Sequence, residues 1–189
     1  MKRIGILGDI GAGKTYIAKS FGFPVFDADK EVGKLYRNNK KIFKKLQKAL
    51  PKYIFSFPIN KNEISKAILI KNSNLKKIID VVHFEVRKKM NLFLKKNRHK
   101  KYVILDIPLL LENNLDQKKD ILIFIQSKRS KILSNLKKRK NFNRRLMNRF
   151  RNIQLPLDYK KKKSHFIIKN NFTNKSVEKE VRYILKKIL

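Results

Sequence analysis

One stretch near the start of the chain decides the fold: Gly8-Asp9-Ile10-Gly11-Ala12-Gly13-Lys14-Thr15. It fits the spacing G-x-x-x-x-G-K-[ST] of a phosphate-binding P-loop, and it lies between an apolar run at 4–7 and a stretch with helical apolar spacing. Glycines let backbone N–H groups turn inward around a phosphate, and the N-terminus of the following helix adds positive potential. The alternative is a glycine turn that merely opens a helix. We favour a nucleotide site with these contact residues: Gly8, Gly11, Ala12, Gly13, Lys14, Thr15 and Tyr16.

Lys14 and Thr15 carry the chemistry of this motif. The lysine ammonium would reach the β- and γ-phosphates of a nucleotide, and the threonine hydroxyl would bind Mg²⁺. The motif therefore predicts a nucleotide and Mg²⁺, but it does not identify the reaction.

Beyond the motif, short apolar runs alternate with helical patterns. The runs typical of buried strands are Arg3–Leu7, Pro24–Phe26, Tyr102–Ile107, Ile121–Ile125 and His165–Ile168. The helical stretches are Lys14–Gly22, Asp29–Arg37, Leu75–Lys96, Ser127–Lys140 and Ser176–Leu189. This alternation predicts an α/β fold of the P-loop NTPase type, with three layers: a five-stranded parallel sheet and helices on both of its faces.

The length of 189 residues fits a single domain. About 75 residues without a clear strand pattern separate the second and third strands, which is too long for one crossover helix. We expect a helical, substrate-binding insertion at about 38–100. The basic run Lys160 to Lys163 is interpreted as a solvated helix face.

Three carboxylates follow predicted strands. Asp106 ends an apolar strand in the manner of a Walker B motif, where it would lie near Mg²⁺, although a strand-end turn would explain it equally simply. Asp27 and Asp29 close the second strand, and their spacing places both on one side if the chain stays extended. This edge of a parallel sheet faces the ligand crevice. Asp29 could instead cap the helix that follows.

The composition restricts the class of protein. Cysteine is absent, which excludes disulfides, thiolate zinc sites and cysteine nucleophiles. No apolar run approaches the ~20 residues of a membrane span, and the N-terminus does not resemble a signal peptide. We therefore expect a cytoplasmic protein with no membrane partner.

The formal net charge of +35 suggests nucleic-acid binding. However, 38 of the 49 basic residues are lysine, and they are spread along the whole chain together with 18 Asn and 23 Ile. Such a bias is typical of an AT-rich genome, whereas readers of nucleic acid more often concentrate arginine on one face. We favour compositional drift, and no specific nucleic-acid partner is expected.

The sequence resembles the dephospho-CoA kinase family, and the similar segments are spread over nearly the whole chain. The P-loop run is similar to the family's GLTGGIGSGKS, and Phe23–Asp29 to its G-x-x-V-I-D-A-D. The stretch 105–113 resembles D-I-P-L-L-F-E, 154–160 resembles Q-L-P-L-E-E-K, and 166–171 resembles F-V-I-D-N-N. The combination is more specific than the P-loop alone, which many unrelated NTPases share.

The resemblance implies transfer of the ATP γ-phosphoryl group to the ribose 3′-hydroxyl of dephospho-CoA, the last step of coenzyme A biosynthesis. It implies that Asp29 positions or deprotonates that hydroxyl, and that Arg139 stabilises the transferring group from a lid at about 128–163. It also implies adenine binding near Asn170. The further expected substrate contacts are Asp27, His83, Pro108 and Leu109.

Plainer interpretations remain open for three of these residues. Arg139 could be a solvated helix charge, His83 a hydrogen-bonding residue at the edge of a core, and Asn170 a polar turn. The sequence also departs from the family pattern at Asp9, Tyr16, Phe84, Asn135 and Phe150.

Two other functions stay open: another small-molecule P-loop kinase, and, with less support, a nucleic-acid-binding NTPase. The sequence leaves the oligomeric state undetermined.

Overall fold

The computed structural model describes residues 1–140 and 142–189, which divide into two compact units. The first unit comprises Met1–Asp27, Leu94–Phe142 and Gln154–Leu189. The second comprises Ala28–Phe93 and Asn143–Ile153. The second unit thus contains most of the insertion that the sequence predicts at 38–100.

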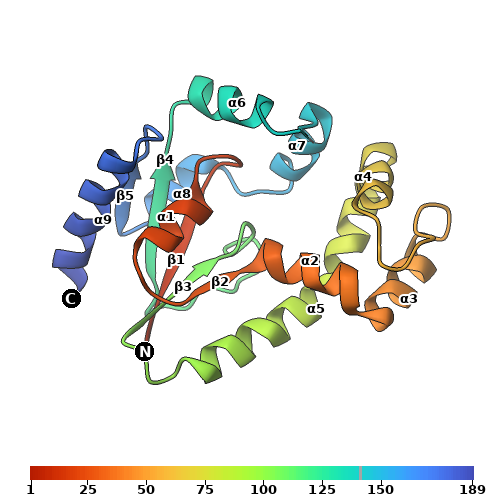
Figure 1. Ribbon diagram of the computed structural model, residues 1–189, viewed down its shortest axis with the longest axis horizontal. Helices are drawn as coiled ribbons and strands as arrows, with labels where there is room; N and C mark the ends of the chain where they lie inside the picture. Colours follow the sequence, from red (N-terminus) through yellow and green to blue (C-terminus); the bar gives the residue numbers. More distant parts are fainter. Residues whose placement is uncertain (141) are drawn as a thin grey trace. The chain divides into compact units, whose positions relative to one another are not determined.

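A parallel sheet forms the centre of the first unit (Figure 1). Its strands are β1 (Lys2–Gly8), β2 (Val25–Asp27), β3 (Tyr102–Asp106), β4 (Ile121–Gln126) and β5 (Phe166–Lys169), in the order β2-β3-β1-β4-β5. All neighbours pair in parallel. β1 and β3 are buried almost throughout because helices cover both faces of a parallel sheet. The predicted five-stranded parallel sheet is confirmed.

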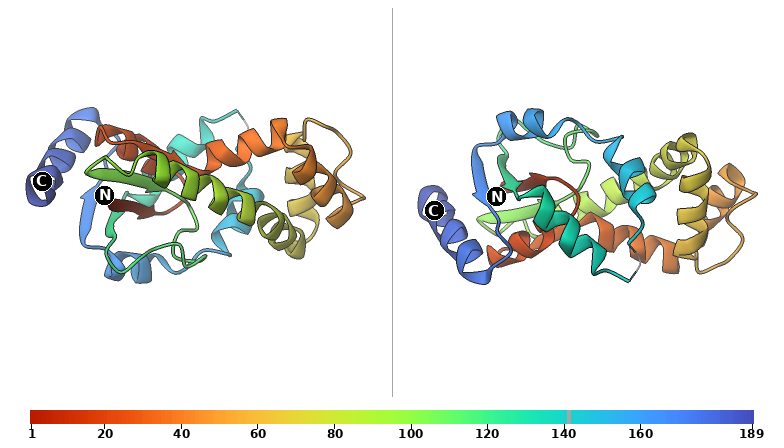
Figure 2. Two further views of the ribbon diagram at one scale, coloured as in Figure 1. Left: turned by 90° about the horizontal axis from the view of Figure 1, so that it is seen from below. Right: turned by 90° about the horizontal axis from the view of Figure 1, so that it is seen from above.

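The helices of the first unit are α1 (Lys14–Ser20), α6 (Arg129–Lys137), α8 (Leu157–Lys163) and α9 (Asn174–Ile188). α1 packs on β1, β2 and β3 with Ile17 and Ala18 buried, whereas α8 packs on β1 and β4. Both views of Figure 2 place α1 and α8 on opposite sides of the sheet. Helices therefore cover both faces, as predicted.

Within its described residues, the regular secondary structure of the second unit is all helical. It contains α2 (Ala28–Asn38), α3 (Lys40–Ala49), α4 (Lys61–Ile70), most of α5 (Asn72–Lys96) and α7 (Arg144–Arg151). The buried Asn74 side chain donates a hydrogen bond to the Ala67 carbonyl at 2.9 Å, which joins α5 to α4. Among the described helices, none has both the length and the apolar character needed to cross a membrane.

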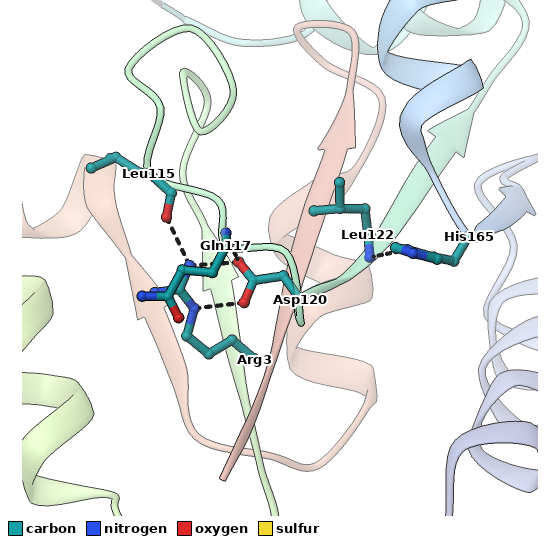
Figure 3. A network of polar contacts seen from close by, with 6 residues as sticks. All are labelled: Arg3, Leu115, Gln117, Asp120, Leu122 and His165. Atoms are coloured by element: carbon teal, nitrogen blue, oxygen red, sulfur yellow. Dashed lines mark hydrogen bonds and ion pairs between the residues drawn. The ribbon is translucent and has the colours of Figure 1, made fainter.

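A buried ion pair joins the amino end of β1 to Asp120, the residue before β4 (Figure 3). The Arg3 Nε lies 2.8 Å from Asp120 Oδ1, and its Nη2 lies 2.5 Å from Oδ2 and 2.7 Å from the Leu115 carbonyl. Asp120 also accepts the Gln117 backbone N–H at 2.9 Å. Because each charge has several partners, Arg3 is tolerated in a buried strand.

The interpretation of the run at Lys160–Lys163 as a solvated face is wrong for Lys160. Only 1% of Lys160 is exposed, and its Nζ lies 2.7 Å from Glu112 Oε1 and 3.3 Å from Gln154 Oε1. The helix packs on the sheet, so one side of its last turn faces inward. Lys160 occupies that side and reaches a buried carboxylate, whereas Lys162 and Lys163 remain exposed.

Candidate functional site

The P-loop connects the end of β1 to the start of α1. Gly13 precedes the helix with φ 90°, a left-handed conformation that favours glycine. A Cβ at Gly13 would lie 2.5 Å from the Asn170 Nδ2 atom, and one at Gly8 would lie 2.7 Å from the Ile125 carbonyl oxygen. These two glycines are therefore required by the backbone conformation and by close neighbours, in addition to any ligand.

The Lys14 side chain folds back over the loop. Its Nζ donates to the carbonyl oxygens of Gly8 at 3.1 Å and Asp9 at 2.9 Å. Asp9, which stands where the family usually has glycine, is buried, and its Oδ1 accepts the Ile10 N–H at 2.7 Å. The carboxylate thus fits inside the loop and leaves its turn intact.

Three oxygen-bearing side chains meet beside the loop. The Thr15 hydroxyl donates to Asp106 Oδ2 at 2.5 Å, and Asp106 is paired in register with Asp27 across β3 and β2. Burial raises the pKa of Asp106; the Thr15 hydrogen bond and the Lys14 ammonium act in the opposite direction, and Asp27 adds to the rise. A hydroxyl and two carboxylates at one sheet edge suit Mg²⁺, which prefers oxygen ligands.

Asn170 and Ser127 lie against the outer side of the P-loop. The buried Asn170 donates from Nδ2 to the Ala12 carbonyl at 2.8 Å, and its Oδ1 accepts the Phe172 N–H at 2.8 Å. Ser127 Oγ donates to the same Ala12 carbonyl at 3.1 Å. Sequence reasoning missed Ser127, although its position directly after β4, at the edge where the P-loop opens, was an available signal.

The remaining predicted residues of the first unit lie on other segments. Half of Tyr16 is exposed, and its hydroxyl donates to Asn174 Oδ1 at 2.7 Å, which connects α1 to the start of α9. Pro108 and Leu109 form a half-buried turn two residues after β3 ends. Arg139 is exposed and follows the end of α6. Within the described residues, no hydrogen bond or ion pair joins Arg139 to the P-loop.

In the second unit, Asp29 lies in the first turn of α2, which begins at Ala28. Asp29 therefore lies within the helix and does not precede it as a cap would. A carboxylate in this position is favoured by the positive end of the helix dipole. Burial raises the pKa of Tyr36 well above its ordinary value, and the Asp29 carboxylate, two turns earlier on the same helix, adds to that effect.

His83 lies on α5 with a buried Nε2 atom that has no hydrogen-bond partner among the described residues. Burial lowers the pKa of His83, and the Arg87 charge lowers it further, whereas Asp80 raises it. The plainer interpretation of His83 as a hydrogen-bonded core residue is therefore not supported at Nε2.

The second unit also has a hollow of about 540 Å³. Arg149 Nη2 donates to the Leu69 carbonyl at 3.4 Å within it. Its lining is mostly amide and guanidinium groups: Leu69, Asn143, Arg145, Asn148, Arg149 and Asn152. This lining suits an anionic group.

Residues 2–176 match the family model for dephospho-CoA kinase. A dephospho-CoA kinase of Wolbachia sp. subsp. Brugia malayi is 34% identical over 187 residues, with 96% of this chain and 95% of the relative covered.

Two solved structures share the fold. TT1252 from Thermus thermophilus has a TM-score of 0.75 at 23% identity, and a dephospho-CoA kinase from Campylobacter jejuni has 0.65 at 21%. Each alignment covers 100% of this chain and 98% of the other. Because the family model spans nearly the whole sequence and the P-loop and its neighbouring carboxylates have the geometry described above, this chain belongs to the dephospho-CoA kinase family.

Proposed function

We propose that this dephospho-CoA kinase transfers the γ-phosphoryl group of ATP to the ribose 3′-hydroxyl of dephospho-CoA by means of the P-loop and the carboxyl edge of the sheet beside it. The observation that carries the proposal is the arrangement of Lys14 over the loop with the Thr15–Asp106 hydrogen bond next to it. The bond between the 3′-oxygen and the γ-phosphorus forms, the bond to the β,γ-bridging oxygen breaks, and ADP leaves.

The P-loop and Lys14 would hold the nucleotide. The Lys14 ammonium donates to two backbone carbonyls, and a phosphate oxygen would be a stronger partner for it. Thr15 and Asp106, with Asp27 beside them, are the residues suited to hold Mg²⁺, which when bound neutralises phosphate charge. Protein groups then contribute mainly alignment and electrostatic stabilisation.

Asp29 is proposed to accept the proton of the 3′-hydroxyl. It follows β2 by two residues, and β2 ends at the same edge of the sheet as β1. Its exposed carboxylate on the first turn of α2 is accessible to an acceptor molecule. Asp27, in contrast, lies beside Asp106 and is better placed for the metal.

Charged groups elsewhere are proposed to bind the rest of the substrates. Arg139, exposed after α6, would stabilise charge on the transferring group. His83, whose side chain is half-buried on α5, would contact dephospho-CoA. The hollow lined by Arg145 and Arg149 is suited to a phosphate of the acceptor.

Product analysis tests this function. Purified protein with Mg-ATP and dephospho-CoA should give CoA and ADP in a 1:1 ratio, and Lys14→Ala should lower turnover by at least about 10²-fold, the effect of removing one donor to a developing negative charge. Lys2→Ala, at the opposite end of β1, is the matched control and should keep normal turnover. Phosphorylation of other acceptors without dephospho-CoA would identify a different small-molecule kinase. An active Lys14→Ala enzyme would reduce the glycine loop to a structural turn.

A further inference from the structure

We propose that Asn170 and Ser127 are positioning residues that together orient the Ala12–Gly13 peptide, so that the Gly13 N–H is presented to a phosphate of the nucleotide. The proposal rests on the proposed role of the P-loop in ATP binding. It assigns these two side chains a role behind the loop, in place of direct contact with adenine.

The Ala12 carbonyl is the shared acceptor. Asn170 Nδ2 donates to it at 2.8 Å and Ser127 Oγ at 3.1 Å. These two donors come from residues directly after β5 and β4, far apart in the sequence, and Ala12 itself is fully buried. One carbonyl oxygen with two donors has both of its lone pairs used, so its direction is fixed.

Because the peptide is planar, the direction of the Ala12 carbonyl also fixes the direction of the Gly13 N–H. In a trans peptide the C=O and the following N–H point to opposite sides. With the Ala12 carbonyl held toward the ends of β4 and β5, the Gly13 N–H is turned away from them. Gly13 is also the residue before α1, and amide groups at a helix N-terminus are the ones that bind phosphate.

Asn170 is itself held rigidly. Only 5% of it is exposed, and its Oδ1 accepts the Phe172 N–H at 2.8 Å. If the amide were reversed, its oxygen would face the Ala12 oxygen and its NH₂ group would face the Phe172 N–H, so both hydrogen bonds would be lost. The close approach of Nδ2 also requires a residue without Cβ at Gly13. The last glycine of the motif and Asn170 thus form one fitted contact.

The shared acceptor makes a specific prediction about pairs of substitutions. Asn170→Asp keeps the size and the acceptor for Phe172 but loses the donor to Ala12, and Ser127→Ala loses the other donor. Ser127→Ala leaves the Asn170 donor and should raise the KM for ATP by about fivefold, the scale of one hydrogen bond. Asn170→Asp also turns a carboxylate oxygen toward the Ala12 oxygen and should raise the KM for ATP further. The double variant should raise it by more than the product of the two single effects, because sites that share a partner are not additive.

Controls separate positioning from folding. Ser127→Thr keeps the hydroxyl and should restore a nearly normal KM for ATP. Asn171→Asp makes the same chemical change one residue away, where the side chain caps only Thr173, and should leave the KM for ATP unchanged. The KM for dephospho-CoA should change by less than about twofold in every variant, as expected for a change confined to the nucleotide site.

Binding of Mg-ADP, measured by calorimetry without dephospho-CoA, gives a second readout. Affinity should fall in the same order as the KM for ATP rises. Normal affinity in the double variant, or equal loss of both substrates together with a lower melting temperature, would overturn the inference. If Asn170→Asp does not fold, the affinity for Mg-ADP is compared between Ser127→Ala and Ser127→Thr, and equal affinities would overturn the inference. A wild-type protein that binds Mg-ADP but makes no CoA would instead refute the proposed function and leave this test intact.

Discussion

Asp29 combines an exposed carboxylate with a position inside the first turn of α2. Asp29→Asn removes the charge and the proton acceptor but keeps the size of the side chain. Turnover should fall by about 10²–10⁴-fold, the usual contribution of a general base. Affinity for ATP should change by less than about tenfold, equivalent to about 1.4 kcal/mol. Turnover, nucleotide affinity and melting temperature are measured on the same variant.

Glu31→Gln is the control for Asp29, because Glu31 lies in the same first turn and forms an ion pair with Lys34 at 2.5 Å. It should keep normal turnover. Normal turnover in Asp29→Asn would show that the Asp29 carboxylate only stabilises the N-terminus of α2 through the helix dipole. A joint collapse of turnover and ATP affinity would assign Asp29 to the metal–nucleotide site.

Single residues differ in how far the sequence predicts them. Lys14 and Thr15 are predictable because the motif's local spacing fixes their position, and Asp106 because it ends a strand. The partners of Ser127 and Lys160 are not predictable, since these partners lie more than a hundred and almost fifty residues away, respectively. Only the folded sheet brings those partners together.

At the scale of elements, α8 is attached to the segment after β3 by one buried carboxylate. Glu112 Oε1 accepts the Leu155 N–H at 2.9 Å and lies 2.7 Å from Lys160 Nζ, while Glu112 Oε2 is buried without a hydrogen-bond partner among the described residues. The Lys160 side chain is 1% exposed and that of Glu112 9%. Removal of the lysine would leave a buried carboxylate without its counter-charge.

Lys160→Met should therefore lower the free energy of unfolding by about 3–5 kcal/mol. Adding Glu112→Gln removes the uncompensated charge and should recover part of this loss. Lys162→Met, on the exposed side of the same helix, should have little effect. Urea unfolding of the four proteins measures these differences. If the double variant were less stable than Lys160→Met, the buried charge would not be the cause.

The strands of the sheet were predictable to within about two residues, because burial on both faces produces continuous apolar runs. The helices α3, α4 and α7 were not individually predicted, since each is short and the segment between α3 and α4 contains Pro51 and Pro58. The signal that could have located them is the residue before each helix. Asn39, Asn60 and Asn143 each accept a backbone N–H from the first turn.

At the scale of the whole molecule, the lid predicted at about 128–163 does not coincide with one unit. Its central part, Asn143–Ile153, belongs to the second unit, and the flanking parts belong to the first. The sequence could not reveal this division, because α7 contacts α4, and only the tertiary structure shows that contact. The family resemblance predicts where the segment lies in the sequence. Which unit each part of it belongs to depends on tertiary packing.

The +35 charge is the other property of the whole chain, and the structure shows where the few acids are used. Asp9, Asp106 and Asp120 are buried, and Glu112 holds Lys160. Each has a hydrogen bond or ion pair within the fold. The remaining acids, among them Asp29 and Glu178, are half-buried or exposed. The preference for drift over selection for a nucleic-acid partner therefore stays a prediction.

The prediction that follows concerns binding to RNA. Exposed lysines attract any polyanion, so a labelled single-stranded RNA should bind at low salt. The logarithm of the binding constant should fall linearly with the logarithm of the salt concentration, with a slope of about −0.7 for each phosphate neutralised. At physiological salt the binding should be weak and equal for homopolymers and mixed sequences. Fluorescence anisotropy at several salt concentrations measures both properties, with CoA formation followed in parallel. A complex that prefers one sequence and survives high salt would show that the basic surface has been selected, because base recognition does not arise from scattered phosphate contacts.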